Sequence, residues 1–252
     1  MPKDRRVTII LAIVAIAIIA VMSIRPIPQD PAYHNFADRR VILNIANFYN
    51  VLSNIPFLVV GLMGMQLIAS GRARGGLVEL QIVYLMFFTG ILLTGFGSAY
   101  YHYHPVNQTL LWDRLPMTIA FMALFTAILG EYISSKIALK LFVPLLMSGM
   151  ASVLYWYIPE LNGRGDLRAY ALVQFLPVVL IPLILWLFNC PLKGSKYIWG
   201  VIGLYVLAKL MEFFDGEVFR GLGLISGHSL KHVFAALGAY VYYLALRKRT
   251  KV

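Results

Sequence analysis

The sequence predicts an all-α integral membrane protein with a seven-helix transmembrane core and an additional N-terminal transmembrane anchor helix. The 252-residue chain is 60% hydrophobic and only 13% charged, whereas soluble domains are nearer half apolar and a quarter charged. Its apolar residues also fall in runs of about 18–25 residues, which is the length a helix needs to cross a bilayer. A soluble protein of this size would need a charged surface that this chain cannot supply.

The first predicted element is a helix over residues 7–24, directly after the basic residues Lys3, Arg5 and Arg6. A basic start before an apolar run is typical of a signal peptide, but only "RPIPQDP" follows, without a small-residue cleavage pattern. The run is also longer than a usual signal core. We therefore expect a retained signal-anchor helix in residues 1–30 and a membrane domain in residues 31–252.

Seven further apolar stretches have the length of membrane spans. The connections between them are too short for a second domain, and no internal repeat is evident. The predicted spans are Asn47–Ala69, Leu77–Tyr101, Thr109–Tyr132, Ile137–Ile158, Ala169–Phe188, Tyr197–Phe214 and His228–Leu246.

The distribution of Lys and Arg predicts the orientation of these spans. More than half of the 22 basic residues lie at the two termini and in alternate loops, and short basic loops face the cytoplasm. Both termini are therefore expected in the cytoplasm. The net charge of +11 does not indicate a nucleic-acid partner, because the basic residues are divided among short loops without forming a basic face.

This orientation brings polar residues from three separate spans to the outer face of the membrane. Ser98 and His102 end one span, Asp113 begins the next, and His228 and His232 begin the last. Ionisable residues within spans are candidates for functional sites. The single cysteine, Cys190, excludes an intramolecular disulfide and a cysteine-based zinc site.

The spacing of these residues predicts a catalytic zinc site. Residues four apart share one face of a helix, so His228 and His232 can chelate one zinc ion, with His102 as the third ligand. Three protein ligands and an open position are typical of catalytic zinc, which acidifies a water molecule bound there. Asp113 could orient or deprotonate that water, and Ser98 could donate a hydrogen bond to the oxyanion.

Other interpretations of the histidines exist. An H-x-x-x-H spacing also occurs by chance, and histidines and serines at an interface are commonly solvated or bonded to a neighbouring helix. A haem held by His102 and His232 would leave Ser98 and Asp113 without a role. His104, which precedes Pro105, and His34 are expected to be loop residues.

Several motifs resemble the alkaline ceramidase family. "GFGSAYYHYHPVNQTLLWDRLPM" is similar to the family's G-x-G-S-x-x-x-H followed by D-E-L-P-M, "IANFYNVLSNIPF" resembles its first core helix, and "GHSLKHVFAALGAY" its last. The resemblance extends from about Ile45 to Tyr240. The wider group, the CREST superfamily, also contains adiponectin/progestin-type receptors and lipid-remodelling proteins of GPI anchors.

The resemblance implies that His102, His228 and His232 are zinc ligands and that Ser98 and Asp113 are the catalytic pair. The implied reaction is hydrolysis of the amide bond of ceramide or a related N-acyl lipid, which releases a fatty acid and a long-chain base. The alternative is a receptor-like or haemolysin-like membrane protein of the CREST type, with a zinc site but a different substrate or none.

The chain departs from the family pattern in three places. Arg114 replaces the Glu of D-E-L-P-M, Asn47 replaces the Glu of the first core helix, and Asp38 is the only carboxylate in the segment where eukaryotic ceramidases bind calcium, which argues against calcium binding. Such divergence fits a bacterial inner-membrane protein with its active site towards the periplasmic leaflet. Lys209 and Glu212, three residues apart, are interpreted as a structural ion pair rather than a part of the site.

Overall fold

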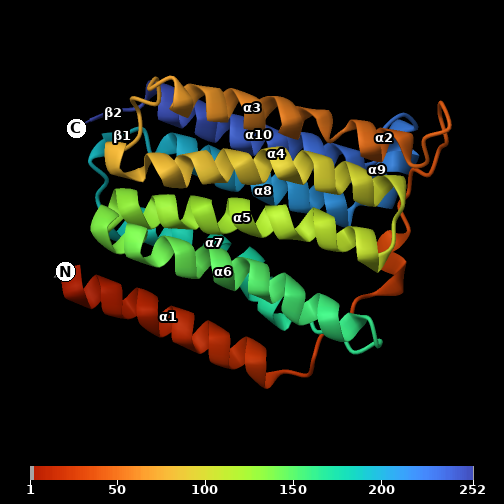
Figure 1. The fold of residues 1–252 in the computed structure, drawn as a ribbon, viewed down its shortest axis with the longest axis horizontal. Helices are drawn as coiled ribbons and strands as arrows, with labels where there is room; N and C mark the ends of the chain where they lie inside the picture. Colours follow the sequence, from red (N-terminus) through yellow and green to blue (C-terminus); the bar gives the residue numbers. More distant parts are fainter. Residues whose placement is uncertain (1–2, 252) are drawn as a thin grey trace.

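The computed structural model describes residues 3–251, and it is a bundle of long helices, as predicted (Figure 1). The helices are α1 Lys3–Ser23, α2 Phe48–Leu52, α3 Ile55–Ala69, α4 Gln81–Tyr103, α5 Asn107–Tyr132, α6 Ser135–Glu160, α7 Arg168–Leu187, α8 Lys196–Phe213, α9 Asp215–Leu222 and α10 Gly227–Lys248, with 3₁₀ turns at Pro31–His34 and Val78–Leu80. A helix therefore occupies each of the eight predicted span positions.

Six of these segments are long and apolar enough to cross a membrane, and the bent pair α8–α9 would be a seventh if it counts as one span. The chain is thus an integral membrane protein. The 22-residue helix α10 is as long as the others but does not meet the same test, since it carries His228, Lys231 and His232 at one end and Arg247 and Lys248 at the other. The prediction of eight spans exceeds the six or seven that length and composition support.

Two of the predicted helices are broken. The first core span is divided into α2 and α3 at Ser53 and Asn54. Pro56 lies in the first turn of α3, where its missing N–H cannot continue the hydrogen bonds of α2, so the helix is interrupted there. The span predicted to end at Phe214 is followed by α9, which bends away by 80°. The sequence analysis did not predict α9, whose charged residues Asp215, Glu217 and Arg220 give it a polar character.

Close packing of α4 against α5 brings the two ends of the segment Gly95–Met117 together. A side chain at Gly97 would collide with the main-chain carbonyl of Trp112. Glycine at this position therefore lets the two backbones approach beside Ser98 and Asp113. Further along α4 from this end of the bundle, Gly90 likewise lets α4 approach the backbone of Ala120 in α5.

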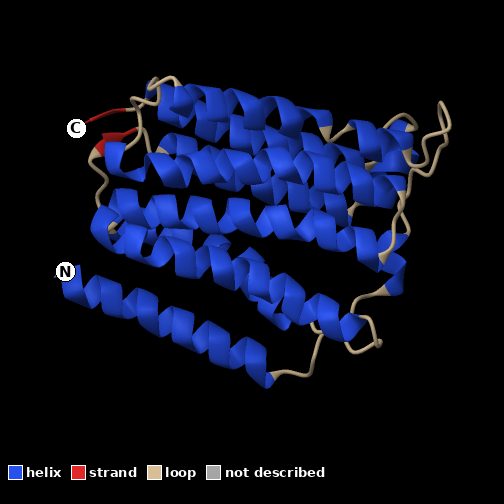
Figure 2. Cartoon of the chain, viewed as in Figure 1, coloured by secondary structure: helices blue, strands red, loops and turns tan. Residues whose placement is uncertain are grey.

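Both termini lie at one end of the bundle, opposite α2 and α9 (Figure 1). At this end a short antiparallel sheet pairs β1, Leu192–Lys193, with β2, Thr250–Lys251, as Figure 2 shows in red. Arg249 binds Glu131 through two hydrogen bonds of 2.7 and 2.8 Å, and both side chains are fully buried. This ion pair connects Arg249, directly after α10, to Glu131 in α5.

Helix α1 lies at the edge of the bundle and packs against α7 (Figure 1). The end of α1 and the residue after it are held by the start of α7, where Arg168 donates hydrogen bonds to the carbonyls of Met22 and Ile24. Burial alone would raise the pKa of Asp166, but hydrogen bonds, chiefly from Arg168, hold that pKa at about 2. A division at residue 30 between an anchor and a core domain remains a prediction.

Candidate metal centre and active-site cavity

Three histidine side chains meet at the end of the bundle that is opposite the termini. His102 comes from the last turn of α4, and His228 and His232 come from the first two turns of α10. The His102 Nε2 atom lies 3.2 Å from the Nε2 of His232 and 3.3 Å from the Nε2 of His228. All three residues are buried, and their ligand atoms lie within 4.8 Å of one another.

This arrangement fits a bound cation better than hydrogen bonding among the rings. A ring nitrogen carries either one proton or one lone pair, so the His102 Nε2 cannot satisfy both of its neighbours. Nitrogen ligands at about 2.0–2.1 Å from a tetrahedral zinc ion are about 3.3 Å apart, which agrees with both distances. The separation of 3.2 Å between His102 and His232 leaves no room for a porphyrin between them.

Ser53 determines which nitrogen of His232 carries the proton. The Ser53 hydroxyl donates its hydrogen to the carbonyl of Asn50 at 3.0 Å, so its oxygen accepts from the His232 Nδ1, which lies 2.7 Å away. With Nδ1 protonated, the lone pair of His232 is on Nε2 and faces the other histidines. A second bond of this kind commonly orients a metal-ligating histidine.

The segment before α2 covers the histidine cluster. The ring of Phe36 packs at 4.7 Å from the His102 ring and 4.8 Å from the His228 ring, measured between ring centres. Asp215, the first residue of α9, accepts hydrogen bonds from the backbone N–H groups of Ala37 and His228, at 2.9 and 2.7 Å. Asp215 therefore connects this covering segment to the start of α10.

A cavity of about 430 Å³ begins at the cluster and extends into the bundle between α4, α5, α7, α8 and α10. Ser98, Asp113 and His232 line it, and the Ser98 side chain approaches the Asp113 carboxylate as a hydrogen-bonding neighbour. Its deeper walls are apolar and include Phe87, Leu124 and Ala239. The cavity therefore joins polar groups at its outer end to a space suited to a hydrocarbon chain.

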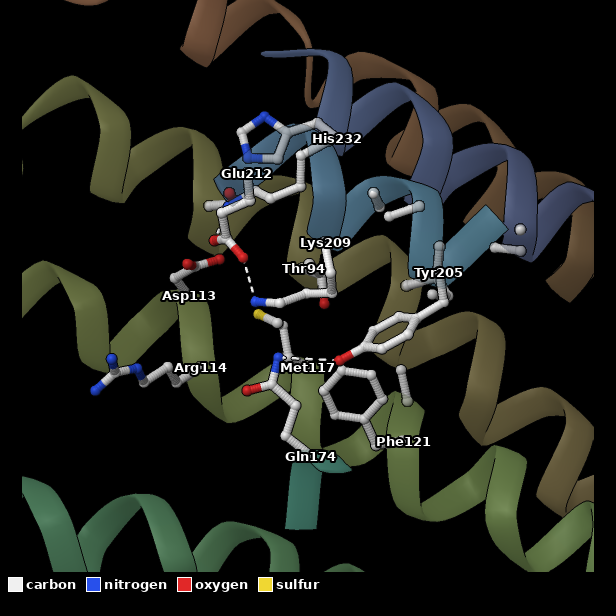
Figure 3. A pocket seen from close by; sticks show the side chains of 18 of the residues that line it. Thr94, Asp113, Arg114, Met117, Phe121, Gln174, Tyr205, Lys209, Glu212 and His232 are labelled. Carbon is white, nitrogen blue, oxygen red and sulfur yellow. Dashed lines mark hydrogen bonds and ion pairs between the residues drawn. The ribbon is translucent and has the colours of Figure 1, made fainter. Parts of the chain in front are cut away.

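A partly buried carboxylate flanked by two lysines also lines this cavity. Glu212 binds Lys231 at 2.9 Å and forms a second ion pair with Lys209 (Figure 3). The predicted pair of Lys209 and Glu212 thus exists, but both residues line the cavity. Lys231 was not singled out in the sequence, although it lies between the two histidines of "GHSLKH".

The remaining polar residues of the sequence analysis have varied surroundings. His104 is exposed and ends α4, as predicted. His34 lies in a 3₁₀ turn rather than an open loop, and its ring bonds Tyr101 at 2.9 Å and Asn107 at 3.0 Å.

Asp38, in the segment before α2 where eukaryotic ceramidases bind calcium, forms an ion pair with Arg40. Arg40 donates hydrogen bonds of 2.8 and 2.6 Å to the two carboxylate oxygens of Asp38. Burial alone would raise the pKa of Asp38, but these bonds and the charge of Arg40 hold it below its usual range. Asn47 donates to the main-chain carbonyl of His102 at 2.9 Å. That this segment does not bind calcium stays a prediction.

A buried three-histidine cluster at the outer end of an apolar cavity, in a helical membrane bundle, defines a membrane-embedded enzyme site that could hold a metal ion. The Ceramidase family model matches residues 34–214, which is more than half of the chain, and the chain belongs to this family. It is therefore a membrane hydrolase acting on amide bonds. The match includes Ser98, His102 and Asp113 and ends before His228 and His232. The chain matches none of the curated proteins.

Proposed function

We propose that this protein is a zinc-dependent hydrolase that cleaves the amide bond of ceramide or a related N-acyl lipid. The observation that carries this proposal is the joint placement of three converging histidines and a carboxylate at the polar end of an apolar cavity. His102, His228 and His232 would hold the zinc ion. When bound, zinc would supply Lewis acidity to the amide carbonyl and to the attacking water.

Asp113 and Ser98 would carry out the proton transfer and the stabilisation of charge. Asp113 would accept a proton as water adds to the carbonyl carbon and would return it to the amine nitrogen as the C–N bond breaks. Ser98 would donate a hydrogen bond to the carbonyl oxygen, where negative charge develops. The products are then a fatty acid and a long-chain base.

The apolar walls support a lipid substrate. Phe87, Leu124 and Ala239 line the deeper cavity, where an acyl chain would be shielded from water. Because the acyl chain would move from the apolar bilayer into an apolar cavity, its affinity would come from packing against these walls rather than from removal from water. The catalytic pair can then be changed with a small effect on lipid affinity.

The test compares Asp113→Asn and Ser98→Ala with the parent protein. Fatty-acid release from ceramide should fall by about 10²–10⁴-fold in Asp113→Asn and by no more than about 10²–10³-fold in Ser98→Ala, while zinc content is retained. Parental rates in Asp113→Asn with zinc in place would exclude that carboxylate from catalysis. A zinc-containing parent that cleaves no N-acyl lipid would favour the receptor-like or haemolysin-like alternative.

We infer the orientation of the protein in the membrane from the distribution of its basic residues. Both termini would lie in the cytoplasm of a bacterium, and the histidine cluster would face the periplasmic leaflet of the inner membrane. Helix α1 would remain attached as an anchor beside the core in residues 31–252.

A further inference from the structure

Arg114 is a buried cation on the wall of the active-site cavity. Only 5% of its surface is exposed, and it lines the same cavity as Ser98 and Asp113. Its Nη2 donates one hydrogen bond of 2.7 Å to the Gln29 side-chain oxygen. Its Nη1 is buried and has no hydrogen-bond partner among the residues that the structure describes.

The other cations of this cavity have a carboxylate partner. Lys209 and Lys231 both bind Glu212. Arg114 forms no ion pair within residues 3–251, and in Figure 3 it extends away from Lys209 and Glu212. Because a buried charge without a partner is unfavourable, the unpaired guanidinium indicates a ligand with a negative charge.

Aromatic rings fix the position of this guanidinium. Its carbon lies 4.3 Å from the centre of the Trp156 ring, 5.0 Å from that of Tyr170 and 5.6 Å from that of Tyr33. The indole Nε1 of Trp156 is also a buried donor without a partner among residues 3–251. The Tyr33 hydroxyl, whose pKa is raised by burial, is a hydrogen-bonding neighbour of Arg114. The group formed by Arg114 and these aromatic residues therefore holds more hydrogen-bond donors than acceptors.

The chemistry of Arg114 and its aromatic neighbours favours an oxyanion as the ligand. A guanidinium offers two parallel N–H groups that match the geometry of a phosphate or carboxylate. Arg114 immediately follows Asp113, whereas Leu124 lies ten residues further along α5, about 15 Å deeper in the cavity. A lipid with its amide at Asp113 and its acyl chain towards Leu124 would thus place its head group near Arg114.

We propose that Arg114 binds an oxyanion on the head group of the N-acyl lipid, so that this enzyme prefers substrates with an anionic head group to neutral ceramide. This inference rests on the proposed function, since it names the substrate class of the same cavity. Arg114 is the residue that replaces the Glu of the D-E-L-P-M pattern.

The test uses two lipids that differ only in the head group, ceramide and ceramide 1-phosphate with the same acyl chain, in mixed micelles. The parent enzyme should have the higher kcat/KM for the phosphorylated lipid. Arg114→Gln should reduce the ratio of the two kcat/KM values by about 10- to 100-fold, the usual range for a hydrogen bond to a charged group. Arg168→Gln, which removes an arginine that binds Asp166 outside the cavity, should leave the ratio unchanged.

A binding measurement separates this inference from the proposed function. Thermal stabilisation of the purified full-length protein by each lipid needs no hydrolysis. If neither lipid is cleaved but ceramide 1-phosphate stabilises the parent more than ceramide does, and Arg114→Gln removes the difference, the proposed reaction fails and the head-group site stands.

Two results would overturn the inference. One is a parent protein that shows no preference for the anionic lipid in either hydrolysis or stabilisation, which decides the matter even if Arg114→Gln does not fold. The other is a folded Arg114→Gln variant that keeps the full preference. Arg114→Lys, which retains the charge but not the paired N–H groups, should keep an intermediate preference.

Discussion

Replacing Ser53 with alanine should weaken metal binding without removing a metal ligand. In the structure the Ser53 oxygen accepts a proton from His232 Nδ1 over 2.7 Å, because the serine's own hydrogen is donated to the Asn50 carbonyl. Without this acceptor, the Nδ1 proton of His232 keeps only the backbone of Asn50 as a hydrogen-bonding neighbour, and the form with a free Nε2 is less favoured. Hydrogen bonds of this type contribute about 10- to 100-fold to metal affinity.

A loss of 10- to 100-fold corresponds to about 1.4–2.8 kcal/mol of binding free energy. The assay is competition for zinc between the purified protein and a chelator of known affinity. Ser148→Ala is the matched control, because the Ser148 hydroxyl also donates to a backbone carbonyl three residues earlier, at 2.8 Å, but on the exposed face of α6. Ser53→Thr retains a hydroxyl and should recover most of the affinity.

The reasoning about His232 would be refuted by a Ser53→Ala variant that binds zinc as tightly as Ser148→Ala does. An equal loss in both variants would also count against it, since the effect would then come from helix stability. The expected pattern is a loss confined to Ser53→Ala, with the thermal stability of the zinc-free proteins unchanged to within about 1 kcal/mol.

Two further predictions concern topology and stability. With Cys190 replaced by serine, a cysteine at the exposed Asn162, between α6 and α7, should react with a membrane-impermeant thiol reagent in intact cells. A cysteine at the exposed Ser70, directly after α3, should react only after lysis. The opposite pattern would reverse the orientation. Glu131→Ala should lower the free energy of unfolding by about 3–5 kcal/mol, because it leaves Arg249 buried without its partner. Unchanged thermal stability of Glu131→Ala would contradict that account. So would a double variant, Glu131→Leu with Arg249→Met, that loses more stability than Glu131→Ala does.

The long helices could be predicted from the sequence because the membrane requires each span to be helical and apolar over about 20 residues. The convergence of His102, His228 and His232 could also be predicted, since the spacing of four residues on one helix is a local pattern. The direction of each span then places the third histidine at the same depth. These inferences need no knowledge of which helices are neighbours.

Other features depended on contacts that no local pattern encodes. Ser53 meets His232 across 179 residues of sequence, and Asp215 meets Ala37 across 178. The end of the span at Phe214 was predicted, but helix α9 was not, because its eight residues carry several charges and form no apolar run. Arg114 was noted only as a departure from a motif, and its aromatic surroundings come from Tyr33, Trp156 and Tyr170, on three other segments.

The metal content of the purified protein tests the central claim most directly. The account predicts about one zinc ion per chain in the parent protein and a sharp loss of zinc in His102→Ala and in the double variant His228→Ala, His232→Ala. The two substituted segments are far apart in the sequence, so loss in both is expected only if the three rings share one ion. Full zinc retention in the double variant, or a folded parent protein that binds no zinc when zinc is supplied, would contradict the account.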